Sequence, residues 1–519
     1  MVLWLKKNRI ARPSSLDEIE RRKMATKVLG IDVGTGGTRA VLLDQAGRVL
    51  GAATAEHAEM ASPQLGWAEQ DPRDWWRAAR VAIEECLTAA GATGAEVSAV
   101  GLSGQMHGLV LLDAAGEVVR PALLWCDQRT EEECREITER VGAKRLIELV
   151  ANPALTGFTL PKIWWVRKHE AELWLRVRSI MLPKDYVRFK LTGARATDVA
   201  DASGTLMFDV AKRRWSAEML EASDLNGDIL PEVFESPEIS GRVTKDGAAA
   251  SGLREGTPVV AGGGDQAAGA VGMGIVAPGN VSATIGTSGV VFAATSDPVV
   301  EPKGRIHTFC HAIPGRWHVM GVTQGAGLSL RWFRDQFAGG ASYDSLMIEA
   351  AAAPAGSDGL LWAPYLMGER TPHLDPNARG ALVGLTAQHT RAHVIRAILE
   401  GVAFSLRDTF TIFRELGVPV KSIRLGGGGA RSYLWQQIQA DIYGMPVDLV
   451  AAEEGAAYGA ALLAGVGTGV WASVDAACET AVRVAKRVEP IAENVELMNR
   501  RYLEYRKLYP ALHGIGHKH

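Results

Sequence analysis

Hydrophobic residues near the start of the chain fall in three short runs, separated by tight turns that contain glycine. The first run begins at Lys27 and continues as VLGIDVG, the second is TRAVLLD (38–44), and the third is VLGAATAE (49–56). Short aliphatic runs bounded by such turns predict neighbouring strands. We therefore expect the first domain to open on a three-stranded β-meander.

The next segment has a helical period. Asp71 and Pro72 precede DWWRAARVAIEECLTAA (74–90), in which apolar residues recur three and four positions apart. Aspartate favours the N-cap and proline the first helical position, so an amphipathic helix is predicted from Pro72. A buried strand, VSAVGLSG (97–104), follows. Strands that alternate with helices in this way predict the α/β class.

The opening pattern recurs in the second half of the chain. VSATIGTSGVVFAAT (281–295) again sets a strand, a glycine–threonine turn and a strand, and its turn aligns with that of the first half. Helices and strands then continue to alternate. They are predicted over 393–416 (helix), 422–429 (strand), 432–443 (helix), 445–450 (strand) and 454–465 (helix).

The repeat predicts two domains of similar topology, each a mixed sheet flanked by helices, with two glycine–threonine turns facing one another across an interdomain cleft. The length of 519 residues also exceeds what one compact core usually holds. The expected boundaries are a disordered N-terminal extension (1–26), a first domain (27–277), a second domain (278–510) and a tail (511–519).

Composition narrows the class of protein. The chain has 56 Lys and Arg against 59 Asp and Glu, so it has no basic field for nucleic acid or for a membrane surface. Five scattered cysteines without a C-x-x-C pair favour a reducing cytoplasm. The uncharged run 455–474 is mostly Gly and Ala and predicts a buried helix rather than a membrane span. A homodimer is one of the assemblies that remain open.

The turn after Asp32 is the first candidate for chemistry. Its residues and the start of the next strand are Gly34, Thr35, Gly36, Gly37, Thr38 and Arg39. Backbone N–H groups approach an anion closely only where side chains are absent, so this turn can hold phosphate while Asp32 holds Mg²⁺ or its water shell. An ordinary glycine hairpin is the alternative. The matching turn of Gly286, Thr287 and Ser288 favours two phosphate sites.

Asp265 is the second candidate. It follows the glycine-rich strand PVVAGGG (258–264) and precedes a helix of small residues. A carboxylate at a strand end, with room for a ligand against it, is suited to act as a general base. Gln266 beside it can hydrogen-bond a hydroxyl group. The alternative is that Asp265 only caps the helix, and the two roles can coexist.

A third candidate is the strand that ends at Leu425 and runs into four glycines, among them Gly427 and Gly428, and then Ala430. A flat aromatic ring or a ribose can lie against such bare backbone, and a flexible turn is the alternative.

Two weaker candidates come from the first half of the chain. Gln105, Met106 and His107 follow a strand and lie between glycines, although a lone histidine is more often structural. Trp125 and Asp127 are either a core aromatic and a surface charge, or a wall and a hydroxyl anchor for a sugar.

Taken in this order, the segments resemble those of the FGGY family of carbohydrate kinases, from about Val28 to the C-terminal helix. No G-x-x-x-x-G-K-[ST], G-x-S-x-G or H-E-x-x-H motif points to another chemistry. The resemblance is carried by GWAEQDPRDWW, GQMHG, LPKDY, TDVADASGT, GGGDQAAGAVG, IGTSG and PYLMGERTPH.

The resemblance implies a two-domain actin-like ATPase (ribonuclease H-like) fold, with the sugar bound mainly by the first domain and ATP mainly by the second. Asp265 would then be the catalytic base and Asp32 the carboxylate linked to Mg²⁺. Met106 and His107 would contact the sugar. By the same resemblance Thr35 and Thr287 belong to the facing phosphate loops, and Gly427 and Gly428 to the nucleotide side.

The implied reaction is the ATP-dependent phosphorylation of a small open-chain sugar, with D-xylulose as the expected acceptor. Ribulose, gluconate and glycerol are the alternatives, and the segment Gln105–His107 argues against glycerol, because glycerol kinases carry charged residues there. A protein of a different class, an actin-like ATP-binding switch without catalysis, also stays open. Asp265 and Gln266 would have no task in such a switch.

Overall fold

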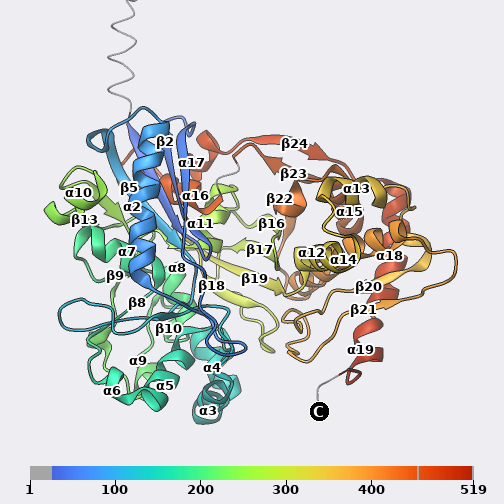
Figure 1. The fold of residues 1–519 in the computed structure, drawn as a ribbon, viewed down its shortest axis with the longest axis horizontal. Coiled ribbons are helices and arrows are strands. Elements are labelled where there is room, and N and C mark those ends of the chain that lie inside the picture. Colours follow the sequence, from blue (N-terminus) through green and yellow to red (C-terminus); the bar gives the residue numbers. More distant parts are fainter. Residues whose placement is uncertain (1–25, 453–454, 517–519) are drawn as a thin grey trace, which may run out of the picture.

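The computed structural model describes residues 26–452 and 455–516. Within them the chain forms two lobes, each built on a seven-stranded mixed sheet with helices packed against it (Figure 1). The predicted α/β fold with two mixed sheets is confirmed. Apart from Thr26, the expected N-terminal extension lies outside the described residues, as do the last three residues of the tail.

The first sheet has the strand order β13-β14-β5-β1-β2-β3, and the short β15 pairs with the end of β5. Because β1 and β2, and then β2 and β3, are antiparallel neighbours, the predicted meander is confirmed. The strands are β1 (Lys27–Val33), β2 (Gly37–Asp44), β3 (Val49–Glu56), β5 (Val97–Gly104), β13 (Ile239–Arg242), β14 (Pro258–Val260) and β15 (Gly263–Gly264).

The second sheet repeats this topology, with the order β18-β19-β17-β16-β22-β23-β24. β16 is antiparallel to β17 and parallel to β22, as β1 is antiparallel to β2 and parallel to β5. The repeat predicted from the two glycine–threonine turns is therefore confirmed. The strands are β16 (Gly279–Ile285), β17 (Gly289–Thr295), β18 (His307–Cys310), β19 (Trp317–Thr323), β22 (Val420–Gly427), β23 (Val447–Val450) and β24 (Val484–Val488).

Helices pack against both sheets, and the remaining short strands pair with one another in two-stranded sheets. The helices are α2 (Pro72–Ala89), α3 (Glu131–Val141), α4 (Ala143–Val150), α5 (Thr159–His169), α6 (Ala171–Trp174), α7 (Pro183–Thr192), α8 (Val199–Ala202), α9 (Ala217–Ala222), α10 (Lys245–Ser251), α11 (Asp265–Gly272), α12 (Ala326–Phe337), α13 (Tyr343–Ala350), α14 (Arg391–Glu415), α15 (Tyr433–Tyr443), α16 (Gly455–Gly467), α17 (Val474–Ala481), α18 (Ala492–Tyr505) and α19 (Leu508–Leu512). The short strands are β4 (Glu69–Gln70), β6 (Val110–Leu112), β7 (Ala122–Leu123), β8 (Ser179–Met181), β9 (Ala196–Asp198), β10 (Phe208–Asp209), β11 (Arg214–Trp215), β12 (Glu232–Phe234), β20 (Leu361–Ala363) and β21 (Ala381–Val383).

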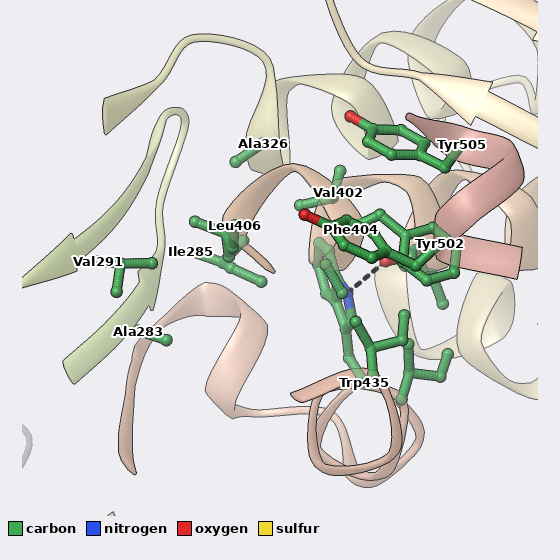
Figure 2. Packing of buried hydrophobic residues seen from close by; sticks show 14 of the residues in the cluster. Ala283, Ile285, Val291, Ala326, Val402, Phe404, Leu406, Trp435, Tyr502 and Tyr505 are labelled. Atoms are coloured by element: carbon green, nitrogen blue, oxygen red, sulfur yellow. Dashed lines mark hydrogen bonds between the residues drawn. The ribbon is translucent and has the colours of Figure 1, made fainter. Parts of the chain in front are cut away.

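Each lobe has its own hydrophobic core. In the first lobe α2 begins as predicted, because the Asp71 side chain caps it by accepting a hydrogen bond from the backbone N–H of Arg73, and Trp75 is fully buried. In the second lobe the long α14 lies at the centre of the core. Figure 2 shows its residue Phe404 packed among aromatic side chains of α15 and α18. Apolar burial of this kind contributes to the stability of both lobes.

The chain crosses back to the first lobe near its C-terminus. Helix α16 packs on β1 and β5, where Gly30 and Gly101 leave room for its backbone. A Cβ atom on either glycine would lie 1.9 Å from a carbonyl oxygen of α16. The predicted buried helix in the run 455–474 is thus confirmed. Its position on the first sheet was not predicted, because the expected domain boundary at residue 278 assigns this helix to the second domain. Over the described residues, no helix has both the length and the apolar character that a membrane span requires.

Candidate active site

A cavity lies between the two lobes and takes its lining from both. Three predicted sugar contacts, Met106, His107 and Trp125, line it together with Asp265 and Gln266. Ser288 of the second predicted phosphate turn lies in the same cavity. The remaining lining residues are Leu155, Gly157, Phe158, Val290, His307, Met320, Val322 and Arg370.

Asp265 reaches the cavity because three strand ends lie side by side beneath it. Gly264 of β15 pairs with Gly104 of β5, which in turn pairs with Val33 at the end of β1. Helix α11 begins at Asp265, and the N-cap position belongs to Gly264. The alternative that Asp265 is the N-cap is therefore wrong.

The two catalytic candidates influence each other electrostatically. Burial and the nearby charge of Asp32 raise the pKa of Asp265 to about 7. Burial raises the pKa of Asp32 to about 6, although the charge of Arg39 opposes the shift. Two carboxyl groups with pKa values raised in this way are typical of a functional site.

The surroundings of Asp32 fit a magnesium ion. Its Oδ1 atom is buried and has no hydrogen-bond partner among the described residues. No group of three or more His, Cys, Asp or Glu in the described part of the chain could form a complete metal site. Mg²⁺ commonly takes one or two carboxylates together with substrate phosphates and water. Asp32 would hold the ion in that way.

The first predicted phosphate turn is held by side chains from neighbouring segments. The Trp125 indole N–H donates to Thr35 Oγ1 at 3.0 Å, and Gln70 Nε2 donates to the Thr35 carbonyl at 2.8 Å. Gln105 Nε2 donates to the Gly34 carbonyl at 3.2 Å. Gln105 is buried, is not among the residues that line the cavity, and supports the turn; its predicted role as a substrate-binding residue stays a prediction.

Three other predicted site residues have their polar atoms engaged away from the cavity. Thr38 Oγ1 hydrogen-bonds His57 Nε2 at 2.9 Å, and Arg39 Nη1 donates to Thr54 Oγ1 at 3.0 Å. Asp127 is fully buried, forms an ion pair with Arg129 at 2.8 Å, and accepts a hydrogen bond from the backbone N–H of Ala68. Of the two alternatives for Asp127, the surface charge is wrong because the side chain is buried, and Asp127 is not among the residues that line the cavity.

The second turn lies beside the predicted nucleotide glycines. Gly286 N–H donates to the Ser288 carbonyl, and the start of α12 donates back to the carbonyls of Gly286 and Thr287. β22 pairs with β16 so that Gly427 lies opposite Ile285. Gly427 has a φ of 71°, and Gly428 and Ala430 follow it in a 3₁₀ turn. The second turn and the glycine segment therefore lie next to each other.

His107 is held in a backbone conformation that non-glycine residues adopt rarely, with a φ of 68°. Its carbonyl accepts hydrogen bonds from Lys162 Nζ at 2.9 Å and Thr159 Oγ1 at 3.1 Å. Burial lowers the pKa of the imidazole to about 3, so the ring is neutral at physiological pH. The contacts to its carbonyl hold the His107 backbone, and the hydrogen bond from its Nδ1 to the Gly204 carbonyl at 2.6 Å orients the ring.

Sequence reasoning missed three residues at this site. Arg370 lies in the segment PYLMGERTPH and lines the cavity. That segment resembles the family, and this resemblance was the signal that could have identified Arg370 as a site residue. His307 and Lys162 carried no such signal, since each is an isolated polar residue in an otherwise ordinary strand or helix.

Two topologically repeated lobes, with a small-residue hairpin in each and a carboxyl group between them, define the fold of the actin-like ATPase class. The chain belongs to the FGGY family of carbohydrate kinases. The family's N-terminal domain matches residues 27–272, and its C-terminal domain matches residues 281–468.

Individual relatives cover most of the chain. The xylulose kinase of Escherichia coli is 42% identical over 422 residues, which are 81% of this chain and 85% of that protein. The xylulose kinase of Bacillus subtilis is 41% identical over 432 residues, 83% of this chain and 86% of its own length. A crystal structure of a "xyloylose kinase" from Brucella ovis has a TM-score of 0.88 at 38% identity and covers 94% of this chain and 100% of its own.

Proposed function

We propose that this protein transfers the γ-phosphoryl group of ATP to D-xylulose and releases D-xylulose 5-phosphate and ADP. The family establishes a carbohydrate kinase, which uses ATP and a sugar. Similarity to the xylulose kinases of two bacteria over more than four fifths of each chain supports xylulose as the sugar. The observation that carries the mechanism is the half-buried Asp265, which lines a cavity between the lobes and has a raised pKa.

Asp265 acts as the general base in this proposal. Its carboxylate accepts the proton of the terminal hydroxyl group while that oxygen attacks the γ-phosphorus in line. The new O–P bond forms as the bond from phosphorus to the β–γ bridging oxygen breaks, and ADP leaves. A pKa of about 7 places the carboxyl group near the pH at which a base works best.

The turns of the two lobes position the phosphates. Backbone N–H groups of 35–36 and 287–288 approach the phosphate oxygens from opposite lobes, because those of Gly34 and Gly286 donate within their own turns. Gly427 and Gly428 leave space for the nucleotide. Asp32 would hold a magnesium ion, which would supply positive charge against the charge that spreads over the phosphate oxygens during transfer. Phosphoryl transfer depends mainly on such positioning and charge stabilisation.

The sugar is held by the part of the cavity that the first lobe lines. Met106 and Trp125 supply apolar walls, and His107 and Gln266 supply hydrogen-bonding groups. Closure of the lobes around both substrates excludes water, which would otherwise compete as the acceptor. A cytoplasmic site of action completes the proposal, because ATP is the donor and all five cysteines are free thiols.

The test is ADP release by the purified protein across a panel of acceptors: D-xylulose, D-ribulose, D-gluconate, glycerol and xylitol. The expected result is the highest kcat/KM with D-xylulose and a negligible rate without an acceptor. A higher kcat/KM with another sugar would reassign the substrate. ADP release that is unaffected by every acceptor would instead indicate an ATP-binding switch.

A further inference from the structure

The cavity wall contains an arginine, Arg370, whose side chain the proposed mechanism does not use. Arg370 lines the cavity from the second lobe, on a segment fixed by a 2.9 Å hydrogen bond from the Thr371 N–H to the Val322 carbonyl. Among the described residues, its guanidinium group forms no hydrogen bond and no ion pair. Burial lowers its pKa from the ordinary value. Arg370 is half-buried, so a ligand in the cavity can accept hydrogen bonds from its guanidinium N–H groups.

The neighbouring carboxyl group does not fill this role. Glu369 Oε1 accepts hydrogen bonds from the backbone N–H groups of Gln324, at 2.9 Å, and Arg370, at 2.8 Å. Burial also raises the pKa of Glu369 to about 8, which favours its neutral form at neutral pH. The Arg370 guanidinium is thus left to face the cavity.

Two histidines near Arg370 are hydrogen-bond acceptors. His107 Nδ1 lies 2.6 Å from the Gly204 carbonyl, so this nitrogen carries the proton. His307 Nδ1 lies 3.0 Å from Asn152 Oδ1, and the Asn152 amide nitrogen donates to the Thr308 carbonyl, which identifies Oδ1 as the acceptor. Burial lowers the pKa of both imidazoles and keeps them neutral. In each ring Nε2 is therefore an acceptor, and no described residue hydrogen-bonds it.

These three side chains share one end of the cavity. The ring of Phe158 packs against both histidines, with centroid distances of 4.9 Å to His107 and 5.7 Å to His307. The guanidinium reaches the same wall, because a Cβ atom on Gly157 would lie 3.8 Å from Arg370 Nη2. The charge of Arg370 contributes to the lowered pKa of both histidines, whereas the charge that helps to raise the pKa of Asp265 is that of Asp32.

We propose that Arg370 donates hydrogen bonds to the carbonyl oxygen of an open-chain 2-ketose and thereby selects a ketose over a polyol. A ketone oxygen only accepts hydrogen bonds and a guanidinium only donates them, so the two are complementary. His107 and His307 accept hydrogen bonds from hydroxyl groups of the same sugar. When the terminal hydroxyl of a 2-ketopentose lies at Asp265, its carbonyl carbon lies three bonds along the chain from the carbon that bears that hydroxyl, so a second group of the cavity wall must bind the carbonyl. This inference rests on the proposed function and adds the basis of its specificity.

The experiment compares D-xylulose with D-arabinitol and xylitol, the two products of reducing its carbonyl group, and with a pentonate. In Arg370→Gln we expect kcat/KM for D-xylulose to fall about 10- to 100-fold, the range for a hydrogen bond to a charged group. The values for both polyols should change less than about threefold, as should the KM for ATP. Calorimetry should show a matching rise in the Kd for D-xylulose without nucleotide. Arg370→Lys, which keeps a charged donor, should recover part of the loss.

The controls separate specificity from folding. Arg135→Gln removes an exposed arginine of α3 and should leave all ratios unchanged. An equal loss of kcat/KM for D-xylulose and the polyols in both Arg370 variants, with unchanged thermal stability, would overturn this inference. It would leave the proposed function intact. A wild-type preference for the pentonate that Arg370→Gln abolishes would also overturn the inference, because the guanidinium would then bind a carboxylate. A wild-type enzyme that prefers a polyol would refute the proposed function together with this inference.

Discussion

Replacing Asp265 with asparagine should stabilise the protein, by an amount that depends on pH. The pKa of this carboxyl group is 3.8 when it is exposed to water and about 7 in the fold. Above pH 3.8 the unfolded chain releases this proton while the folded protein keeps it until about pH 7. The carboxyl group therefore lowers stability increasingly as pH rises through this window. A shift of about 3 units corresponds to about 4 kcal/mol at pH 8.

Thermal unfolding of the wild type and Asp265→Asn at pH 5 and pH 8 measures this effect. At pH 8 the variant should unfold about 5 °C higher, because 1 kcal/mol shifts Tm by about 1–2 °C in a chain of this size. At pH 5 the gain should shrink to about a third. Glu59→Gln, at an exposed position, is the control and should change little at either pH. An equal gain at both pH values, or none at pH 8, would refute the reasoning about Asp265.

Three further substitutions test other parts of the site. Asp32→Ala should raise the Mg²⁺ concentration that gives the half-maximal rate at least about tenfold, while the KM for the sugar changes little. An unchanged dependence of the rate on Mg²⁺ concentration would exclude Asp32 as the ligand. His107→Asn should raise the KM for D-xylulose about tenfold and that for ATP less than about twofold, since one hydrogen bond to the sugar is lost; equal changes in both KM values would argue against a sugar contact. Gly427→Ala places a Cβ 2.5 Å from the Ile285 carbonyl oxygen at a positive φ, so nucleotide binding should weaken with sugar binding unchanged, and calorimetry showing normal ADP affinity would contradict this.

Much of the fold follows from local sequence patterns. The meander, the helix from Pro72 and the second hairpin depend on contacts between neighbouring residues, and all were predicted. The path of α16 was not predicted, because it depends on contacts between segments more than 350 residues apart. Gly30 and Gly101 were the only local signs, since a glycine inside a strand often marks a close backbone approach.

The site was predictable where a residue's surroundings are set by its own segment. Asp265 and Ser288 lie at strand ends or turns, and the structure brings both to the cavity. Asp127 was misjudged because its burial depends on Arg129 and on a backbone N–H from a distant loop. Arg370 and His307 join the cavity only through packing between the lobes, which spacing along the chain does not encode.

The most direct test of the account is the turnover of Asp265→Ala with ATP and D-xylulose, measured beside the affinity of the same variant for ADP. The account predicts that kcat falls by at least about a thousandfold while the Kd for ADP stays within about threefold of the wild type, because the base acts on the sugar hydroxyl and not on the nucleotide. An Asp265→Ala enzyme that keeps turnover near the wild-type rate would contradict it.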